Sequence, residues 1–352
     1  MGNICGISTT LKLLNMKSEE RHIIRCLPTV KGLMCCLLAW VLSSCSSLID
    51  EDLSDCLYGT GIRFEYLIYD DNGGAADAFP TSVDLVSLYI FDDEGKYIAT
   101  RTESGEALRN PQWRMTLDLE PGSYHLIAWA GLDGESFTGP QACTVKEDTH
   151  VELNHEEMVS KSELHPLWHG AADIIVEKDY TEHTVSLIKD TRRIRIILQQ
   201  INGNPVDDKH FDFAITDDNS RLGHDNLPIP NGTLTYRPYS TGQQGVGGQP
   251  DGTGATMVAF AEFSTSRLVE GNPTRLRIHR TTDDEPVIDI PLLDYLLLRR
   301  AEGSKLTDQQ FFDRNDAYTL VFFLDKNLSW LKTQIIINGW VIRLNEGELG
   351  TD

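Results

Sequence analysis

Histidines and acidic clusters are the side chains of this sequence that could bind a metal ion. His165 and His169 have the i, i+4 spacing of zinc ligands on one helix face, but Pro166 lies between them and no third ligand is close in sequence. Asp207-Asp208 and Asp217-Asp218-Asn219 offer oxygen ligands for calcium, but they lack the spacing and the glycine of an EF-hand loop. We interpret all of these residues as parts of ordinary turns, and expect neither a metal site nor a cofactor.

Residue patterns typical of a catalytic centre are also missing from the sequence. It contains no G-x-S-x-G elbow and no G-x-x-x-x-G-K-[ST] phosphate loop. The G-x-G fragment at 245–247 follows a loop-like stretch and is interrupted by Pro250, which argues against a strand-to-helix phosphate cradle. Acidic pairs occur throughout the chain, and none stands out as the carboxylate pair of a glycosidase. We predict that the protein is not an enzyme.

Cys45 has the sequence context of a covalent lipid attachment site. A basic stretch ending at Lys31 precedes the uncharged apolar run Gly32–Leu42, and Ser43-Ser44-Cys45 follows. These are the parts of a secretory signal, and the run of 11 residues is too short for a spanning helix, which needs about 20. Leu42-Ser-Ser-Cys45 resembles a bacterial lipobox, in which the thiol receives a diacylglyceryl group and the chain is cut just before it. We predict a signal peptide over 1–44, starting at Met1 or Met16, and a lipid-anchored Cys45; the alternative is a short anchor helix with a chance cysteine.

The residues after Cys45 predict where the lipoprotein resides. Ser46 is not the aspartate of an inner-membrane retention signal, so we expect Cys45 to carry the lipid in the outer membrane. Asp50-Glu51-Asp52 resembles the surface-export signal of Bacteroidales lipoproteins, although a solvated acidic linker is the alternative. The net charge of the whole chain is -22 although its first 44 residues are basic, so the remainder repels phosphate backbones. We therefore expect no nucleic-acid partner.

The remaining sequence reads as short strands separated by turns rich in Gly, Pro and Asp. Such segments at roughly ten-residue spacing predict an antiparallel β-sandwich. The predicted strands are 61–69, 83–91, 96–101, 113–119, 124–130, 185–188, 193–199, 211–216, 233–236, 256–263, 275–279, 316–324 and 334–344.

Three other segments have a different pattern. Pro291–Arg300 predicts a helix, because its leucines share one face and proline suits a first turn. A second short helix is expected at 156–162, and the glycine-rich stretch 238–256 predicts a flexible loop. The resulting organisation is a tether over 45–60, a first β-sandwich domain over 61–183 and a second over 184–352.

An ordered set of short motifs carries a family resemblance. The motifs are Asp55-Cys56, Ile62–Tyr66, Val86–Asp92, Leu119–Tyr124, Ala128–Gly131, Pro166–Gly170, Leu187–Arg195, Ile288–Leu293, Asp313–Thr319 and Ile337–Arg343. In this order they resemble the FimB-like fimbrial anchor subunits of Bacteroidales type V pili. The resemblance implies an all-β chain of two tandem transthyretin-like sandwich domains with a short helix in the second, no catalysis, and a place at the base of a fimbria on the outer membrane.

The resemblance also implies how the chain meets its partner, the major stalk subunit. Related stalk subunits polymerise when a strand of one subunit fills a groove in the next, which is strand addition. An anchor lipidated at its N-terminus should keep its first strand, so strand 61–69 is expected to stay in its own sheet. Edge strands are templates for strand addition, and Gln334, Ile335, Ile336 and Ile337 are apolar enough to pair well. We therefore predict an assembly edge at these four residues.

A surface glycan-binding lipoprotein is the alternative function. Trp113, Trp129, Trp168 and Tyr239 could stack on sugars if their rings were exposed. Most tryptophans in strands belong to the core, however, so we rank this reading below a fimbrial anchor with a role in cell adhesion.

Cys56 and Cys143 are the two cysteines left after the signal peptide and the lipid are assigned, and they predict a disulfide in an oxidising compartment. The bond would close a loop of nearly ninety residues and stabilise the fold by about 2–4 kcal/mol through the unfolded state. Mass spectrometry of protein purified from the cell envelope without reductant should find the linked peptides. Two free thiols that react with an alkylating agent in the folded protein would show instead that the cysteines are unpaired.

Overall fold

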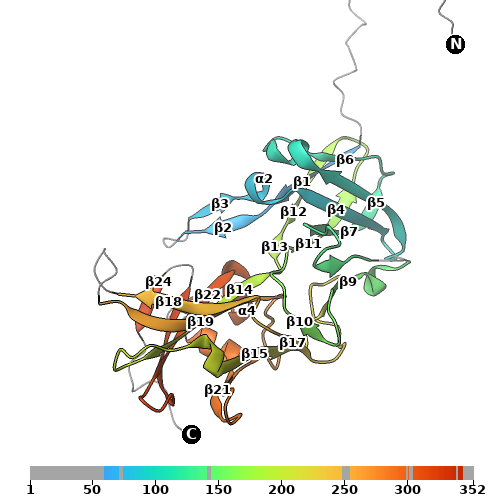
Figure 1. The fold of residues 1–352 in the computed structure, drawn as a ribbon. Helices are drawn as coiled ribbons and strands as arrows, with labels where there is room; N and C mark the ends of the chain where they lie inside the picture. The colour runs from blue at the N-terminus through green and yellow to red at the C-terminus, as the bar shows by residue number, and fades with distance from the viewer. Residues whose placement is uncertain are drawn as a thin grey trace, which may run out of the picture. The chain divides into compact units, whose positions relative to one another are not determined.

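The computed structural model describes residues 59–70, 74–140, 144–247, 254–298, 300, 304–337 and 340–343 (Figure 1). The predicted signal peptide, Cys45, Cys56 and Cys143 lie outside these residues. Strands dominate the described ranges, so the predicted all-β class is confirmed. None of the helices in these ranges is long and apolar enough to cross a membrane.

The first sandwich consists of two sheets that share one hydrophobic core. Its smaller sheet has the order β12-β1-β6, and its larger sheet the order β13-β11-β7-β4-β5. The strands are β1 (Thr60–Glu65), β4 (Leu85–Asp92), β5 (Tyr97–Ser104), β6 (Met115–Leu117), β7 (Gly122–Ala130), β11 (Trp168–Val176), β12 (Thr181–Ser186) and β13 (Ile188–Lys189). Strand β12 runs across the predicted domain boundary at 183/184 and pairs with β1 up to Ser186. The first sandwich therefore includes residues on both sides of that boundary.

The central strands of the larger sheet are buried on both faces. Leu88 of β4 and Leu126 of β7 face the core shared with β1, whereas Phe91 and Ile127 belong to a second core that continues into the rest of the chain. A strand that is covered on both faces reads as a continuous apolar run rather than an alternating one. The sequence Val86-Ser-Leu-Tyr-Ile-Phe91 is such a run, and it forms β4 for this reason.

The second sandwich is built from sheets of five and six strands around that second core. Their orders are β10-β17-β15-β20-β21 and β18-β19-β14-β22-β23-β24. The strands are β10 (Val159–Ser160), β14 (Arg192–Gln200), β15 (Phe211–Asp217), β17 (Leu234–Tyr236), β18 (Ser240–Val246), β19 (Thr256–Thr265), β20 (Arg275–Arg280), β21 (Pro286–Pro291), β22 (Ala317–Leu324), β23 (Trp330–Ile337) and β24 (Trp340–Arg343). Most pairs are antiparallel, but β1 with β12, β10 with β17 and β14 with β22 are parallel.

Smaller elements complete the two sandwiches. Strands β2 (Leu67–Tyr69) and β3 (Ala75–Asp77) form a ribbon directly after β1, and β16 (Arg221–Gly223), β9 (His150–Leu153) and β8 (Phe137–Thr138) form a short sheet. The helices are α2 (Phe79–Ser82), α3 (Leu292–Leu297) and α4 (Asp308–Arg314), with 3-10 turns at η2 (Gly105–Arg109), η3 (Lys146–Asp148) and η4 (Asp208–His210).

The predictions for irregular segments have mixed outcomes. The helix expected in 291–300 is present as α3, with Leu292, Leu293 and Leu296 buried. The helix expected at 156–162 is wrong. There the chain makes a tight turn in which Glu157 and Met158 have positive φ, and the next two residues pair with β17. The loop expected at 238–256 is wrong in part, because β18 forms within it.

Strand β1 fills the middle position of its sheet. It pairs with β12 from Thr60 to Glu65 on one side and with β6 from Thr60 to Ile62 on the other. Ile62 and Phe64 are buried in the first core, at 0% and 3% exposure. Residues 61–65 of the predicted first strand therefore pair within their own sheet in this structure, and the retention of this strand on assembly stays a prediction.

Ile62→Ala should destabilise the protein by about 2–5 kcal/mol, because a fully buried isoleucine loses its packing and leaves a cavity. Ile68 offers a matched control: it lies on β2, and 49% of the residue is exposed. Ile68→Ala should change the free energy of unfolding by less than about 0.5 kcal/mol. Urea unfolding measures both variants. Equal effects would show that β1 does not contribute to the core as described.

Candidate functional site

The four residues of the predicted assembly edge lie in β23. Their backbone pairs with β22 on one side, where Ile336 lies opposite Thr319, and with β24 on the other, where Ile336 lies opposite Val341. The outer position of this sheet belongs to β24. A partner could therefore pair with Gln334–Ile337 only after displacing β24, and the assembly role of these residues stays a prediction.

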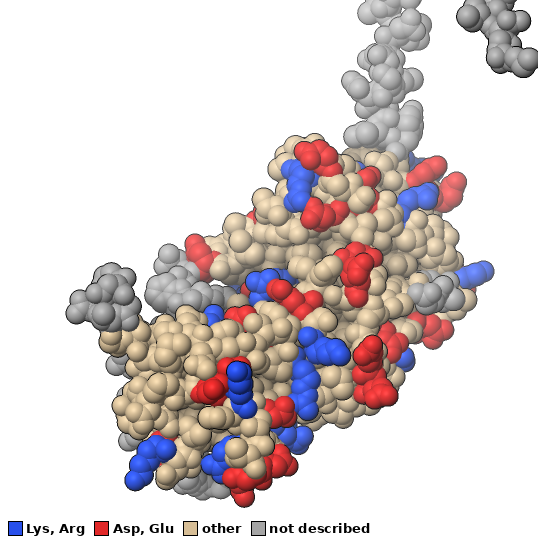
Figure 2. Space-filling model, viewed as in Figure 1, with Lys and Arg blue, Asp and Glu red and all other residues tan. Residues whose placement is uncertain are grey.

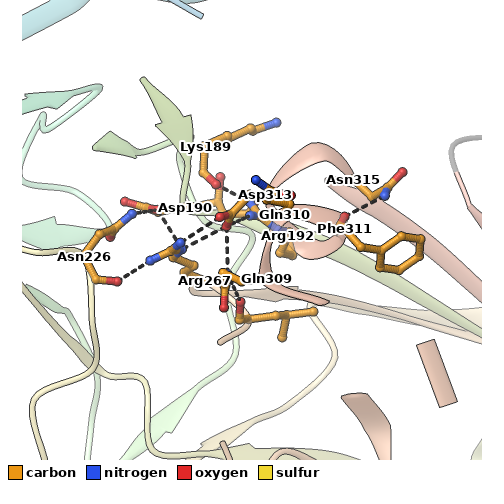
Figure 3. Close-up of polar contacts among 12 residues, drawn as sticks. Lys189, Asp190, Arg192, Asn226, Arg267, Gln309, Gln310, Phe311, Asp313 and Asn315 are labelled. Carbon is orange, nitrogen blue, oxygen red and sulfur yellow. Dashed lines mark hydrogen bonds and ion pairs between the residues drawn. The ribbon is translucent and has the colours of Figure 1, made fainter. Parts of the chain in front are cut away.

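Four charged residues, three of them buried, lie close together where the chain crosses between the sandwiches (Figure 3). Asp190 lies between β13 and β14, Arg192 begins β14, Arg267 follows β19 and Asp313 is on α4. Asp190 and Arg192 are fully buried, and Arg267 is 5% exposed. We call these four residues, with Asn226, the crossing cluster.

Hydrogen bonds and ion pairs connect every member of the crossing cluster. Arg267 makes a bidentate ion pair with Asp313: its Nε donates to Oδ1 at 3.1 Å and its Nη2 donates to Oδ2 at 2.8 Å. Its Nε also lies 3.9 Å from Asp190 Oδ1, which accepts a 2.9 Å hydrogen bond from Asn226 Nδ2. Arg192 Nη2 lies 3.7 Å from Asp313 Oδ1. Each arginine of the cluster thus has a carboxyl partner within it.

The crossing cluster joins segments of both sandwiches. The Asp190 backbone N–H donates to the Leu167 carbonyl, just before β11, at 2.6 Å. The Arg192 guanidinium donates to the Lys189 carbonyl, and that of Arg267 to the Asn226 carbonyl. The cluster's charged side chains contact one another and backbone carbonyls. It can fix the crossing of the chain, but it does not resemble a reaction centre.

Burial decides the protonation of two groups at this crossing. It raises the pKa of Asp190 to about 7, in spite of the opposing pull of Arg267 and of the hydrogen bond from Asn226. It lowers the pKa of His169 to about 4, so that the ring is neutral at pH 7. His169 Nε2 lies 2.9 Å from the His224 carbonyl oxygen, and that nitrogen therefore carries the proton and donates it.

The metal-ligand candidates have other partners. His165 lies 2.6 Å from Asp133 at the surface, whereas His169 packs its buried ring against Trp129. Asp217 accepts hydrogen bonds from Thr274 Oγ1 at 2.7 Å and Asn272 Nδ2 at 2.9 Å, so both of its carboxylate oxygens are occupied by protein donors. No cluster of three metal-ligating side chains occurs within the described ranges.

The four aromatic residues proposed for sugar stacking are mostly unavailable. Trp129 and Trp168 are buried, at 0% and 4% exposure. Trp113 stacks on Phe64 with its ring centroid 6.1 Å away and packs against the first core. Tyr239, just before β18, is half-buried.

On the face drawn in Figure 2, basic and acidic side chains are intermixed, so no large patch of one sign is visible there.

The sequence offered a signal for one part of the crossing cluster that we did not use. Helix α4 begins with a capping box, in which Thr307 and Gln310 bond to each other's backbone N–H. This Thr-x-x-Gln pattern is a known helix-start signal. The role of Asn226 has no comparable signal in the sequence.

Comparisons with known proteins identify the family. The model of the Fimbrillin-A associated anchor proteins Mfa1 and Mfa2 matches residues 53–346, which is most of the chain. The chain belongs to this anchor family. Membership makes it a fimbrial or adhesin-type protein of the cell surface, in a family that is structural rather than enzymatic. No curated protein matches the chain.

Solved structures agree with this family. A candidate adhesin from Bacteroides thetaiotaomicron is 39% identical, with 84% of this chain and 100% of that one covered and a TM-score of 0.74. A second protein of that organism, named as a candidate polysaccharide-binding protein, is 32% identical over 82% of this chain and 99% of its own, with a TM-score of 0.71. The fimbrial anchor protein Mfa2 of Porphyromonas gingivalis, at 14% identity and a TM-score of 0.61 over 81% of this chain and 99% of its own, shares the fold.

Asp190→Asn should remove a pH dependence from the stability of this anchor-family protein. With its pKa raised from 3.8 to about 7, the folded protein holds a proton between pH 4 and 7 that the unfolded chain has released. The wild type therefore loses stability relative to the variant as the pH rises through this window, by up to about 4 kcal/mol. Urea unfolding at several pH values tests this. Exposed Asp93 is the control, since Asp93→Asn should give a curve parallel to the wild type; a parallel curve for Asp190→Asn would contradict the assignment.

Proposed function

We propose that this chain is an outer-membrane lipoprotein, acylated at Cys45, that holds a fimbria on the cell and contacts the basal stalk subunit by strand addition. In this proposal the segment 45–60 serves as the tether, Cys45 is the only membrane attachment, and the chain catalyses no reaction. The anchor family supports the fimbrial part, and the Leu42-Ser-Ser-Cys45 sequence supports the lipid.

The position of β1 is the observation that carries the proposal. A subunit built to receive a strand in its first sandwich would need an open groove there, but β1 already occupies the place between β12 and β6. The first sandwich is thus closed by its own chain. This is what a terminal subunit of a fimbria requires, because its first strand stays connected to the lipid instead of being removed.

One comparison supports the alternative function, a surface glycan-binding protein. The relative that is 32% identical carries a polysaccharide-binding name. The burial of Trp129 and Trp168 removes two of the four aromatic rings on which that reading depended. A purified protein that bound cell-surface polysaccharide but not the stalk subunit would favour it.

Cys45→Ala should abolish lipid attachment, because one thiol carries the whole membrane anchor in this account. Metabolic labelling with a palmitate analogue should mark the wild type and leave the variant unlabelled, and fimbriae should pass into the culture medium. Cys143→Ala is the matched control, since it removes a cysteine outside the lipobox and should label normally. Labelling of the Cys45 variant at the wild-type level would rule out this attachment site.

A further inference from the structure

The outer strands of the larger sheets differ in how their open edges are protected. Natural proteins guard such edges with proline, charge or a covering segment. Strand β21 has proline at both ends, and β24 is four residues long. Strand β5 carries Arg101 and Glu103, and its first residue, Tyr97, donates a 2.9 Å backbone bond to Thr144. Each of these edges has at least one feature that hinders pairing with another chain.

Strand β18 has neither proline nor charge of its own, although η4 and the neighbouring Asp207 contact it at Gln243. Its sequence, Ser240-Thr-Gly-Gln-Gln-Gly-Val246, contains no charged residue and no proline, and most of its residues are exposed. It pairs with β19 along its whole length, from Ser240 opposite Glu262 to Val246 opposite Thr256. In the described ranges no strand pairs with its outer side. Because neighbouring residues alternate in direction, every second residue of β18 points its backbone N–H and C=O groups away from β19.

A partly buried aromatic ring lies on the face of β18 beside this edge. Gly242 has no side chain, and a Cβ atom there would lie 3.1 Å from the Phe260 ring. The ring of Phe260 thus lies against the β18 backbone, with the Arg195 guanidinium 5.0 Å from its centroid. A strand added at the edge would meet a flat aromatic and cationic surface there, to which apolar or aromatic side chains bind well.

We infer that β18 is the edge to which an extended strand of the fimbrial stalk subunit adds. The inference rests on the proposed function and names the surface that the function leaves open. Backbone pairing accepts many sequences, which suits a neutral strand made of Ser, Thr, Gly and Gln. Pairing of β18 with a second copy of this chain is disfavoured, because the net charge of -22 makes two copies repel each other.

Proline substitutions at two adjacent positions test the edge directly. Neighbouring residues of a strand point their N–H groups to opposite sides, so one of Gln243→Pro and Gln244→Pro removes a bond to β19 and the other removes an outward donor. Each variant replaces the lipidated wild type in cells, and an immunoblot of the stalk subunit compares cells with medium. The outward variant should shed most fimbriae while the purified protein still unfolds cooperatively. Retention of fimbriae by both folded variants would overturn the inference.

A photocrosslinking amino acid at exposed Thr241 gives a readout that does not depend on the folding of a proline variant. It should crosslink to the stalk subunit, identified by antibody, whereas the same amino acid at Thr100 on β5 should not. A crosslink from Thr100 alone would overturn the inference.

Two further variants separate this inference from its alternatives. A double variant, Ile336→Cys and Val341→Cys, places two cysteines at opposite positions of β23 and β24. A disulfide bond between them would hold β24 on β23. Fimbriae should stay on cells with this lock, and their loss would move the contact to Gln334–Ile337. If unlipidated Cys45→Ala cells kept their fimbriae, the proposed function itself would fail, which is a different result from failure at β18.

Discussion

Two arginines and two aspartates, all but Asp313 buried, pair at the crossing between the sandwiches and are the constraint on which much of this structure depends. A buried charge is tolerated only with a partner, and removing one partner of such a pair commonly costs about 3–5 kcal/mol. Arg267 must therefore meet Asp313 and Asp190, which fixes the end of β19, helix α4 and the start of β14 together. The Asp190 backbone bond to Leu167 extends this constraint to the first sandwich.

The second core strengthens the same connection by apolar packing. It includes Phe91 and Trp129 of the first sandwich together with Ile196 and Phe322 of the second. The larger sheet of the first sandwich is thus covered on both faces, and the segment that leaves it contributes β9 and β10 to sheets shared with later residues. In the proposed role of a fimbrial anchor, a pull on one sandwich would be carried to the other through this packed core and the paired charges.

Sequence patterns predicted the parts of the fold that local chemistry determines. Apolar and alternating runs marked most strands, and the leucine face beginning at Leu292 marked α3. Strand β18 could not be found this way, because Gly and Gln have low strand propensity and only pairing with β19 holds them extended. The prediction of a single strand over 334–344 missed the division into β23 and β24, although Asn338-Gly339 is a strong hairpin signal. The crossing cluster depends on contacts between residues far apart in sequence, so local patterns could not predict it.

The central claim is that β1 remains in its own sheet while the protein serves as an anchor. Hydrogen–deuterium exchange of residues 60–65, measured in the purified lipoprotein and again in fimbriae with the anchor attached, tests this most directly. Amides in a central, doubly paired strand open only with the surrounding core. The account predicts slow exchange of these amides in both samples. Fast exchange of the same amides in the assembled fimbria, with protection intact elsewhere in the first sandwich, would show that β1 is released on assembly and would contradict it.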